Sequence, residues 1–119
     1  MKKFLKSIVV TILTIITAIT LFACAPSTIK EAKNKMEDLG YTTIYVNETK
    51  QNGLLGTAKF MRVDKNGSDI ITVFLYDSAR TANSLKGKYQ KTVNKNESVS
   101  VDGKWIIIAT ENAKKDFQK

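Results

Sequence analysis

The chain has no histidine and only one cysteine, one proline and one tryptophan among its 119 residues. Without histidine it lacks the general base of a Ser-His-Asp triad and a common nitrogen ligand of zinc. A single cysteine excludes a disulfide within the chain, so the folded part has to be stabilised by packing alone. Neither a phosphate-binding P-loop nor a dinucleotide-binding fingerprint occurs. We therefore expect no enzyme, no cofactor and no metal site.

Carboxylates are the remaining candidates for catalysis, but their positions favour structural roles. Glu37 and Asp38 are adjacent, so their side chains point in different directions on a helix. Asp64 and Asp69 flank a predicted turn. The sequence leaves a glycosidase-like pair open. Exposed or turn-forming carboxylates are the simpler interpretation, and we predict no catalytic residue.

Basic residues outnumber acidic residues, 19 to 11. Without the lysines of the first six residues, 16 basic and 11 acidic residues remain, a net charge of +5. Such a balance favours anionic partners such as lipid headgroups or wall polymers. The charges are dispersed and form no long run, which is also typical of an ordinary solvated surface. The basic balance alone therefore predicts no particular partner.

The first 24 residues have the layout of an export signal. A lysine-containing amino terminus precedes an uncharged run over residues 8–22, and small residues follow. A membrane-spanning helix fits less well, because the run is near the lower length limit and contains four threonines. An ordinary signal peptidase could use the pattern Ala23-Cys24-Ala25. That cleavage would leave Pro26 at the first mature position and discard the only cysteine.

A third interpretation uses the cysteine. Leu21 and Ala23 stand three residues and one residue before Cys24, and this segment resembles the lipobox of bacterial lipoproteins. Phe22 departs from the family pattern, in which a smaller residue is usual. The resemblance covers residues 1–24 only. It implies cleavage before Cys24 and a diacylglycerol thioether on its sulfur, which makes the thiol unavailable for catalysis.

The resemblance also implies a location and a partner. Two acyl chains give stable anchoring where one gives only marginal binding. The predicted location is the extracytoplasmic face of the cell membrane, with membrane lipid bound through Cys24. The chain then divides into a signal peptide (1–23), a lipidated cysteine with a short tether (24–27) and one small domain (28–119). Residues 25–27 reach only about 10 Å when extended, so the domain is expected close to the membrane.

Residue patterns in the mature part predict an α+β domain. Thr28 and Glu31 form a capping box at the start of a helix, and Gly40 stands where the helix should end. Further helices are predicted from Asp77 or Ser78 and from Thr110. Strands are predicted over residues 41–46, 55–63, 69–76, 98–101 and 104–109, with a loop at 47–53 and a type I′ turn at Asp102-Gly103. The order α-β-β-β-α-β-β-α predicts a single antiparallel sheet of about five strands, with helices mainly on one face.

The predicted function rests on the anchor, the short tether and the missing catalytic residues, and one aromatic pair is a candidate binding surface. Tyr41 and Tyr45 share one face of a regular strand, so both can be exposed together and would then suit a saccharide or peptide platform. Core packing, or a partly covered sheet face, is the default interpretation for both. The element order also resembles a double-stranded RNA-binding domain, but export makes a nucleic acid an unexpected partner.

We therefore predict a non-enzymatic binding or interaction module of the cell envelope. Its partner would be an envelope protein or a wall polymer. A solute-binding accessory of a transporter or sensor is the alternative.

Overall fold

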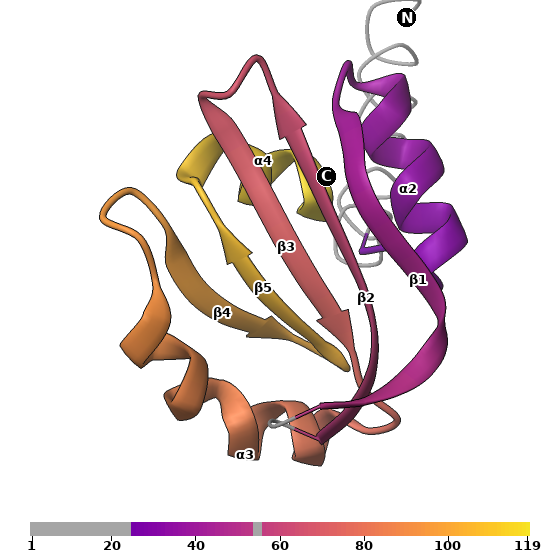
Figure 1. Ribbon diagram of the computed structural model, residues 1–119, viewed down its shortest axis with the longest axis vertical. Coiled ribbons are helices and arrows are strands. Elements are labelled where there is room, and N and C mark those ends of the chain that lie inside the picture. The colour runs from indigo at the N-terminus through magenta and orange to yellow at the C-terminus, as the bar shows by residue number, and fades with distance from the viewer. Residues whose placement is uncertain (1–24, 54–55) are drawn as a thin grey trace, which may run out of the picture.

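The computed structural model describes residues 25–53 and 56–119 and contains one antiparallel sheet with the strand order β1-β2-β3-β5-β4. Three helices pack on this sheet (Figure 1). The predicted α+β fold and element order are confirmed. No helix in the described part is long and apolar enough to cross a membrane. The elements are α2 (Ile29–Asp38), β1 (Thr42–Gly53), β2 (Gly56–Lys65), β3 (Asp69–Leu75), α3 (Ala79–Tyr89), the 3-10 turn η1 (Gln90–Thr92), β4 (Ser98–Asp102), β5 (Trp105–Ala109) and α4 (Glu111–Gln118).

The predicted caps of α2 and α3 form, with one change of partner, whereas Thr110 stands at the start of α4 without a side-chain cap hydrogen bond. The Thr28 hydroxyl accepts a hydrogen bond from the Glu31 amide at 3.1 Å, as an N-cap should. The Glu31 carboxylate reaches one residue further back and accepts from the Ser27 amide at 3.0 Å and the Ser27 hydroxyl at 2.7 Å. Gly40, with φ +95°, ends α2 in a conformation that favours glycine. Ser78 caps α3 by accepting from the Thr81 amide at 3.2 Å.

Strand β1 is longer than the sequence predicts. Residues 47–53 were expected to form a loop, yet β1 continues through them and pairs with β2 up to Gly53 opposite Gly56. The pairing is irregular between Thr43 and Tyr45 and again between Asn47 and Gln51. An edge strand tolerates such bulges and polar residues because one side of it faces solvent. The loop prediction was therefore wrong, since polar composition alone does not distinguish a loop from an exposed edge strand.

The last hairpin also turns one position later than predicted. Asp102 pairs with Trp105, so the two turn residues are Gly103 and Lys104. Of these only Gly103 has a positive φ, +59°, which is the arrangement of a type II′ turn. The predicted type I′ turn at Asp102-Gly103 was therefore wrong.

One face of the sheet is covered by α2 and α4. Alternate residues of β2, β3 and β5 point to this face and meet the apolar sides of both helices. The resulting core is closed, and many of its side chains have no exposed area. Its members are Ile29, Ala32, Met36, Tyr41, Met61, Val63, Ile71, Val73, Trp105, Ile107, Ala109, Ala113 and Phe117.

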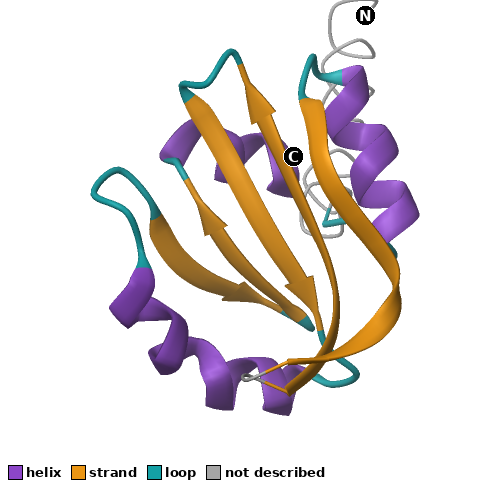
Figure 2. Cartoon of the chain, viewed as in Figure 1, coloured by secondary structure: helices purple, strands orange, loops and turns teal. Residues whose placement is uncertain are grey.

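The opposite face carries α3 alone. Figure 2 shows this helix crossing one end of the sheet and leaving the other end without a helical cover. A smaller cluster forms beneath α3, made of Ala58, Tyr76, Ala82, Tyr89 and Ile106. Within it the hydroxyls of Tyr76 and Tyr89 form a buried hydrogen bond of 2.7 Å. The two faces of one sheet are therefore packed very differently.

Candidate functional site

The segment that follows Cys24 is packed against the domain. Ala25 contacts the core under α2 and α4, and Pro26 is buried. The Trp105 indole nitrogen donates a buried hydrogen bond of 2.6 Å to the Pro26 carbonyl, which joins the start of the domain to the start of β5. Ser27 is held by the Glu31 carboxylate. Residues 25–27 therefore pack against the folded domain.

Two hollows lie beside this segment. The larger, of about 350 Å³, is lined by residues 25–27 and by Leu75, Trp105 and the turn between β4 and β5. The smaller, of about 180 Å³, is lined by Ser27, Leu75, Tyr76, Asp77 and three lysines, Lys50, Lys59 and Lys104. Small-molecule sites typically have volumes of about 300–1,000 Å³. The larger hollow is thus at the low end of that range, and the smaller one is below it.

We call Lys50, Lys59 and Lys104 the anchor-side lysines, because they share a hollow with Ser27. Lys50 forms an ion pair with Asp77, with a nitrogen–oxygen distance of 2.8 Å. The hydrogen bond from Lys50 lowers the pKa of Asp77, and the positive charges of Lys59 and Lys104 act in the same direction. Within the described residues Lys59 and Lys104 have no ion-pair partner of their own. The hollow is therefore electropositive.

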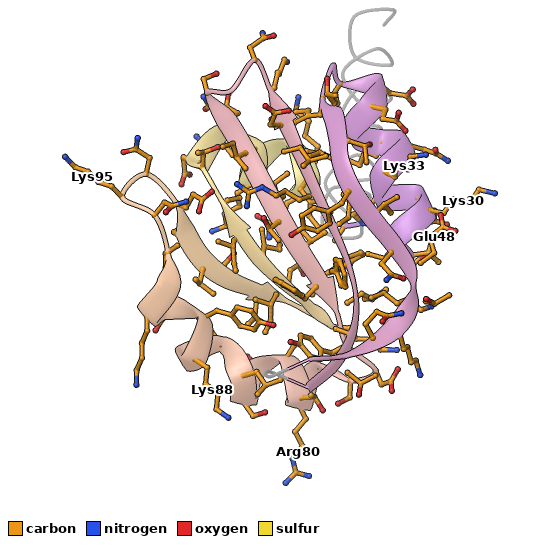
Figure 3. The ribbon with its side chains drawn as sticks, in the orientation of Figure 1. Lys30, Lys33, Glu48, Arg80, Lys88 and Lys95 are labelled. Carbon is orange, nitrogen blue, oxygen red and sulfur yellow. The ribbon has the colours of Figure 1, made fainter. Side chains whose placement is uncertain are left out.

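Other lysines are spread over the molecule. Figure 3 shows Lys30, Lys33, Lys88 and Lys95 pointing outward from α2, α3 and the loop after α3. Such charges are screened by salt and define no site. The anchor-side lysines differ because they come from β1, β2 and the last turn and converge on one hollow. Sequence reasoning missed them, since their spacing along the chain gives no signal.

An aromatic row crosses the face that α3 leaves partly uncovered. The ring of Tyr45 meets Phe60 edge-on at 5.5 Å, Phe60 lies 6.2 Å from Phe74, and Phe74 lies 4.9 Å from Tyr89. Beside the row, Arg62 donates a hydrogen bond of 3.0 Å to the Thr72 hydroxyl. We call the uncovered part the open face. It comprises Tyr45, Phe60, Arg62, Asp64, Ile70 and Ile108, of which Tyr45 is exposed and the rest are half-buried.

Three consecutive apolar side chains are exposed on strand β1. Ile44 is 52% exposed, Tyr45 41% and Val46 36%. In the described part of the chain no other large hydrophobic side chain is exposed. β1 is also an edge strand, so its outer side has backbone groups that pair with no other strand. Tyr45 pairs with Arg62 of the open face and Val46 with Met61 of the covered face, so these side chains lie on both sides of the sheet edge. We call Ile44, Tyr45 and Val46 the β1 patch.

The structure separates the two tyrosines that were candidates for one platform. Tyr41 is only 4% exposed and belongs to the core under α2 and α4, so the default interpretation of core packing is correct for it and the surface role is excluded. Its hydroxyl donates a hydrogen bond of 2.8 Å to Asp116, and burial is the main cause that raises the pKa of Tyr41. The pairing shift between Thr43 and Tyr45 breaks the alternation on which a shared exposed face relied. Tyr45 alone remains a candidate for binding.

The other predicted residues are placed as follows. Cys24, Leu21 and Ala23 lie outside the described residues. Asp69 accepts a hydrogen bond of 3.0 Å from Thr110, and Glu37 pairs with Lys33 at 3.7 Å. Within residues 25–53 and 56–119 no group of acidic or cysteine side chains is arranged to hold a metal ion.

Comparisons with protein-family models, with curated proteins and with solved structures found no match to this chain.

Proposed function

We propose that this protein is a small lipoprotein of the bacterial cell envelope, attached to the extracytoplasmic face of the membrane through lipid on Cys24. Its domain would act there as a non-enzymatic binding module. The lysine-containing start, the apolar run and the lipobox-like residues Leu21 and Ala23 support the anchor. The packing of residues 25–27 adds to this, because it leaves one peptide bond between the attachment point and a residue in contact with the core.

The single observation that carries a binding role is the β1 patch. An exposed apolar run on an edge strand invites either an added strand or an apolar contact from a partner. Soluble domains usually blunt such edges with charge, and here Glu48 and Lys50 follow the patch but do not interrupt it. Tyr45 also joins the patch to the aromatic row of the open face. The proposed partner is an envelope protein or a wall polymer that contacts both.

The anchor is tested by mass spectrometry of the mature amino terminus. The expected peptide begins at Cys24 and carries the mass of a diacylglycerol. In the Cys24→Ala variant the protein should leave the membrane fraction or remain as an uncleaved precursor. A mature terminus at Pro26, or an unmodified Cys24 in membrane-bound protein, would contradict the proposed anchor.

The binding role is tested by photo-crosslinking in intact cells. A photoreactive amino acid at Tyr45 should give a discrete adduct with one envelope component. The same amino acid at Lys95, which points outward from the loop after α3, is the control and should give none (Figure 3). Equal labelling at the two positions, or none at Tyr45, would count against a binding surface at the β1 patch.

A further inference from the structure

We propose that the anchor-side lysines form a binding site for the phosphate of anionic phospholipid headgroups in the membrane that holds the protein. This inference rests on the proposed function, because the lipid on Cys24 brings the site to the membrane. The site would give the domain a second, electrostatic contact with the membrane, in addition to the lipid on Cys24, and the phosphate of the headgroup would be its ligand. It also implies a defined orientation of the domain on the membrane surface.

The position of the site is the first argument. Ser27 lines the same hollow as Lys50, Lys59 and Lys104. Ser27 is three residues from Cys24, and Ala25 and Pro26 are held against the domain by core packing and by the Trp105 hydrogen bond. One trans peptide spans about 3.8 Å between Cα atoms, so the attachment point stays close to this end of the domain. A membrane holding Cys24 therefore lies next to the anchor-side lysines.

The charge of the site is the second argument. Lys50 is neutralised by Asp77, whereas Lys59 and Lys104 have no ion-pair partner in the part of the chain that the structure describes. Asp102 lines the neighbouring hollow and accepts a hydrogen bond of 3.1 Å from Gln118. Two ammonium groups thus remain to meet an anion. Lysine is a strongly hydrated point charge that suits phosphate, and the hollow of about 180 Å³ has room for several waters of ~30 Å³ each, hence for a phosphate group.

The expected strength of the contact can be given as a change in affinity for each lysine. An anionic membrane surface attracts each nearby lysine with an effect equivalent to about a fivefold change in affinity. This attraction falls off within a Debye length, about 10 Å at 0.1 M salt. Lysines that are distant from the attachment point, such as Lys95, should therefore not respond. The response should also disappear at high salt.

The test uses the full chain isolated from membranes and placed in nanodiscs. One set of discs contains phosphatidylcholine alone, and the other contains phosphatidylcholine with phosphatidylglycerol. A soluble amine-reactive reagent acetylates the lysines, and mass spectrometry of the digest gives the rate at each one. On anionic discs Lys59 and Lys104 should react about fivefold more slowly than on neutral discs. Lys95 and Lys115 should react equally on both. Equal rates at Lys59 and Lys104 on the two discs, or an equal slowing of all four lysines, would overturn the proposal.

Two further arms separate the remaining interpretations. In the first arm, inorganic phosphate is added to neutral discs. If it protected Lys59 and Lys104 as strongly as anionic lipid does, the ligand would be a soluble anion, and the proposal of a lipid headgroup would be overturned. The double variant Lys59→Gln/Lys104→Gln should lose the preference for anionic discs, whereas Lys95→Gln/Lys115→Gln, which removes the same charge, should keep it. If both double variants lost the preference for anionic discs, net charge alone would explain the effect, and the proposal of a localised site would be overturned.

The same digest distinguishes this proposal from the proposed function. The amino-terminal peptide reports whether Cys24 carries lipid. Lipid on Cys24 without lysine protection contradicts the headgroup site only. Lysine protection without lipid on Cys24 contradicts the proposed anchor and supports the site, because the comparison of two membranes does not depend on how the chain is attached.

Discussion

The two faces of the sheet differ in what covers them, and adjacent residues of β2 show the difference directly. Met61 and Val63 point toward α2 and α4 and have no exposed area. On the same strand, Arg62 lies between them and Phe60 precedes Met61. Both of these side chains point to the other face and are half-buried. The covered face is closed by two helices, whereas α3 covers one end of the opposite face. The covered face thus supplies the closed core, and the open face is free to contact a partner.

Aromatic rings link the open face to the part that α3 covers. Tyr45 and Phe60 on the open face are followed by Phe74 and Tyr89 in the cluster beneath α3, at ring distances of 4.9 to 6.2 Å. Aromatic pairs with such offset or edge-on geometry contribute about 0.5–1.5 kcal/mol beyond the area they bury. Each ring thereby shields part of its neighbour from water. A face protected in this way keeps apolar surface available without exposing a large continuous patch.

The largest expected difference between the two faces is in core truncation. Met61→Ala removes a fully buried side chain and should lower the free energy of unfolding by about 2–5 kcal/mol. Phe60→Ala on the open face should cost clearly less, about 1–2 kcal/mol, because its ring is already partly exposed to water. Urea titrations of both variants measure the two losses. Equal losses would mean that the open face is as tightly packed as the covered one.

The next largest loss of stability is expected when a hydrogen bond at the rim of the covered face is removed. Tyr41→Phe removes the hydroxyl that donates to Asp116 and should cost about 1.5–3 kcal/mol, as expected for a hydrogen bond to a charged group. Tyr45→Phe, the same change on the open face, should be nearly neutral. Thermal unfolding of the two variants provides the comparison. A loss at Tyr45 as large as that at Tyr41 would contradict the difference in burial.

The pair of Tyr41 and Asp116 also predicts that the free energy of unfolding depends on pH in the acidic range. Burial by itself raises the pKa of Asp116, but hydrogen bonds from Tyr41 and Lys119 outweigh it, so the pKa is lowered overall. The unfolded chain then binds more protons than the folded one, so stability decreases as the pH falls from the ordinary Asp pKa of about 3.9 through the lower folded value. Asp116→Asn should make the stability curve flatter in this range. Urea titrations at a series of acidic pH values measure it, and an unchanged slope would exclude Asp116 as a source.

Loosening the segment that follows Cys24 should have a smaller and more local effect. Trp105→Phe keeps a ring in the covered face but removes the 2.6 Å hydrogen bond to Pro26, at an expected cost of about 1 kcal/mol. The amide of Ser27 should then exchange with deuterium faster, while amides in the centre of β3 should not. Hydrogen exchange read by mass spectrometry tests this. Uniform acceleration throughout the domain would show that Trp105 acts through general stability instead.

The smallest effect on stability is expected on the β1 patch. Tyr45→Ser removes a side chain that is 41% exposed together with its ring contact to Phe60, and should lower the free energy of unfolding by about 0.5 kcal/mol, the low end for an aromatic pair. The crosslink formed from the neighbouring position Ile44 should nevertheless disappear in this background. Unfolding curves and crosslinking in the same cells check both statements. A stable variant that keeps the crosslink would remove Tyr45 from the proposed binding surface.

The sequence predicted the fold well because the residues that start and end its helices act locally. Thr28, Gly40 and Ser78 each mark a helix end through their own backbone preferences, and the apolar run over 69–76 indicated the central strand, β3. The errors arose where a partner strand decides the outcome. Residues 47–53 are polar and resemble a loop, yet pairing with β2 makes them a strand.

The candidate site was less predictable for the same reason. The position of Tyr41 depended on a bulge that strict alternation does not anticipate. The anchor-side lysines meet only because three distant segments fold to one place. Side chains brought together by tertiary structure leave no periodic signal along the chain.

The hydrogen bond between Trp105 and Pro26 also bears on timing during biogenesis. Trp105 lies 79 positions from Pro26, so the bond forms only once nearly the whole chain has emerged and β5 has joined the sheet. Before then this hydrogen bond cannot hold residues 25–27 against the domain, and afterwards it does. The proposed processing at Cys24 would therefore have access to an unrestrained segment only until the sheet is complete.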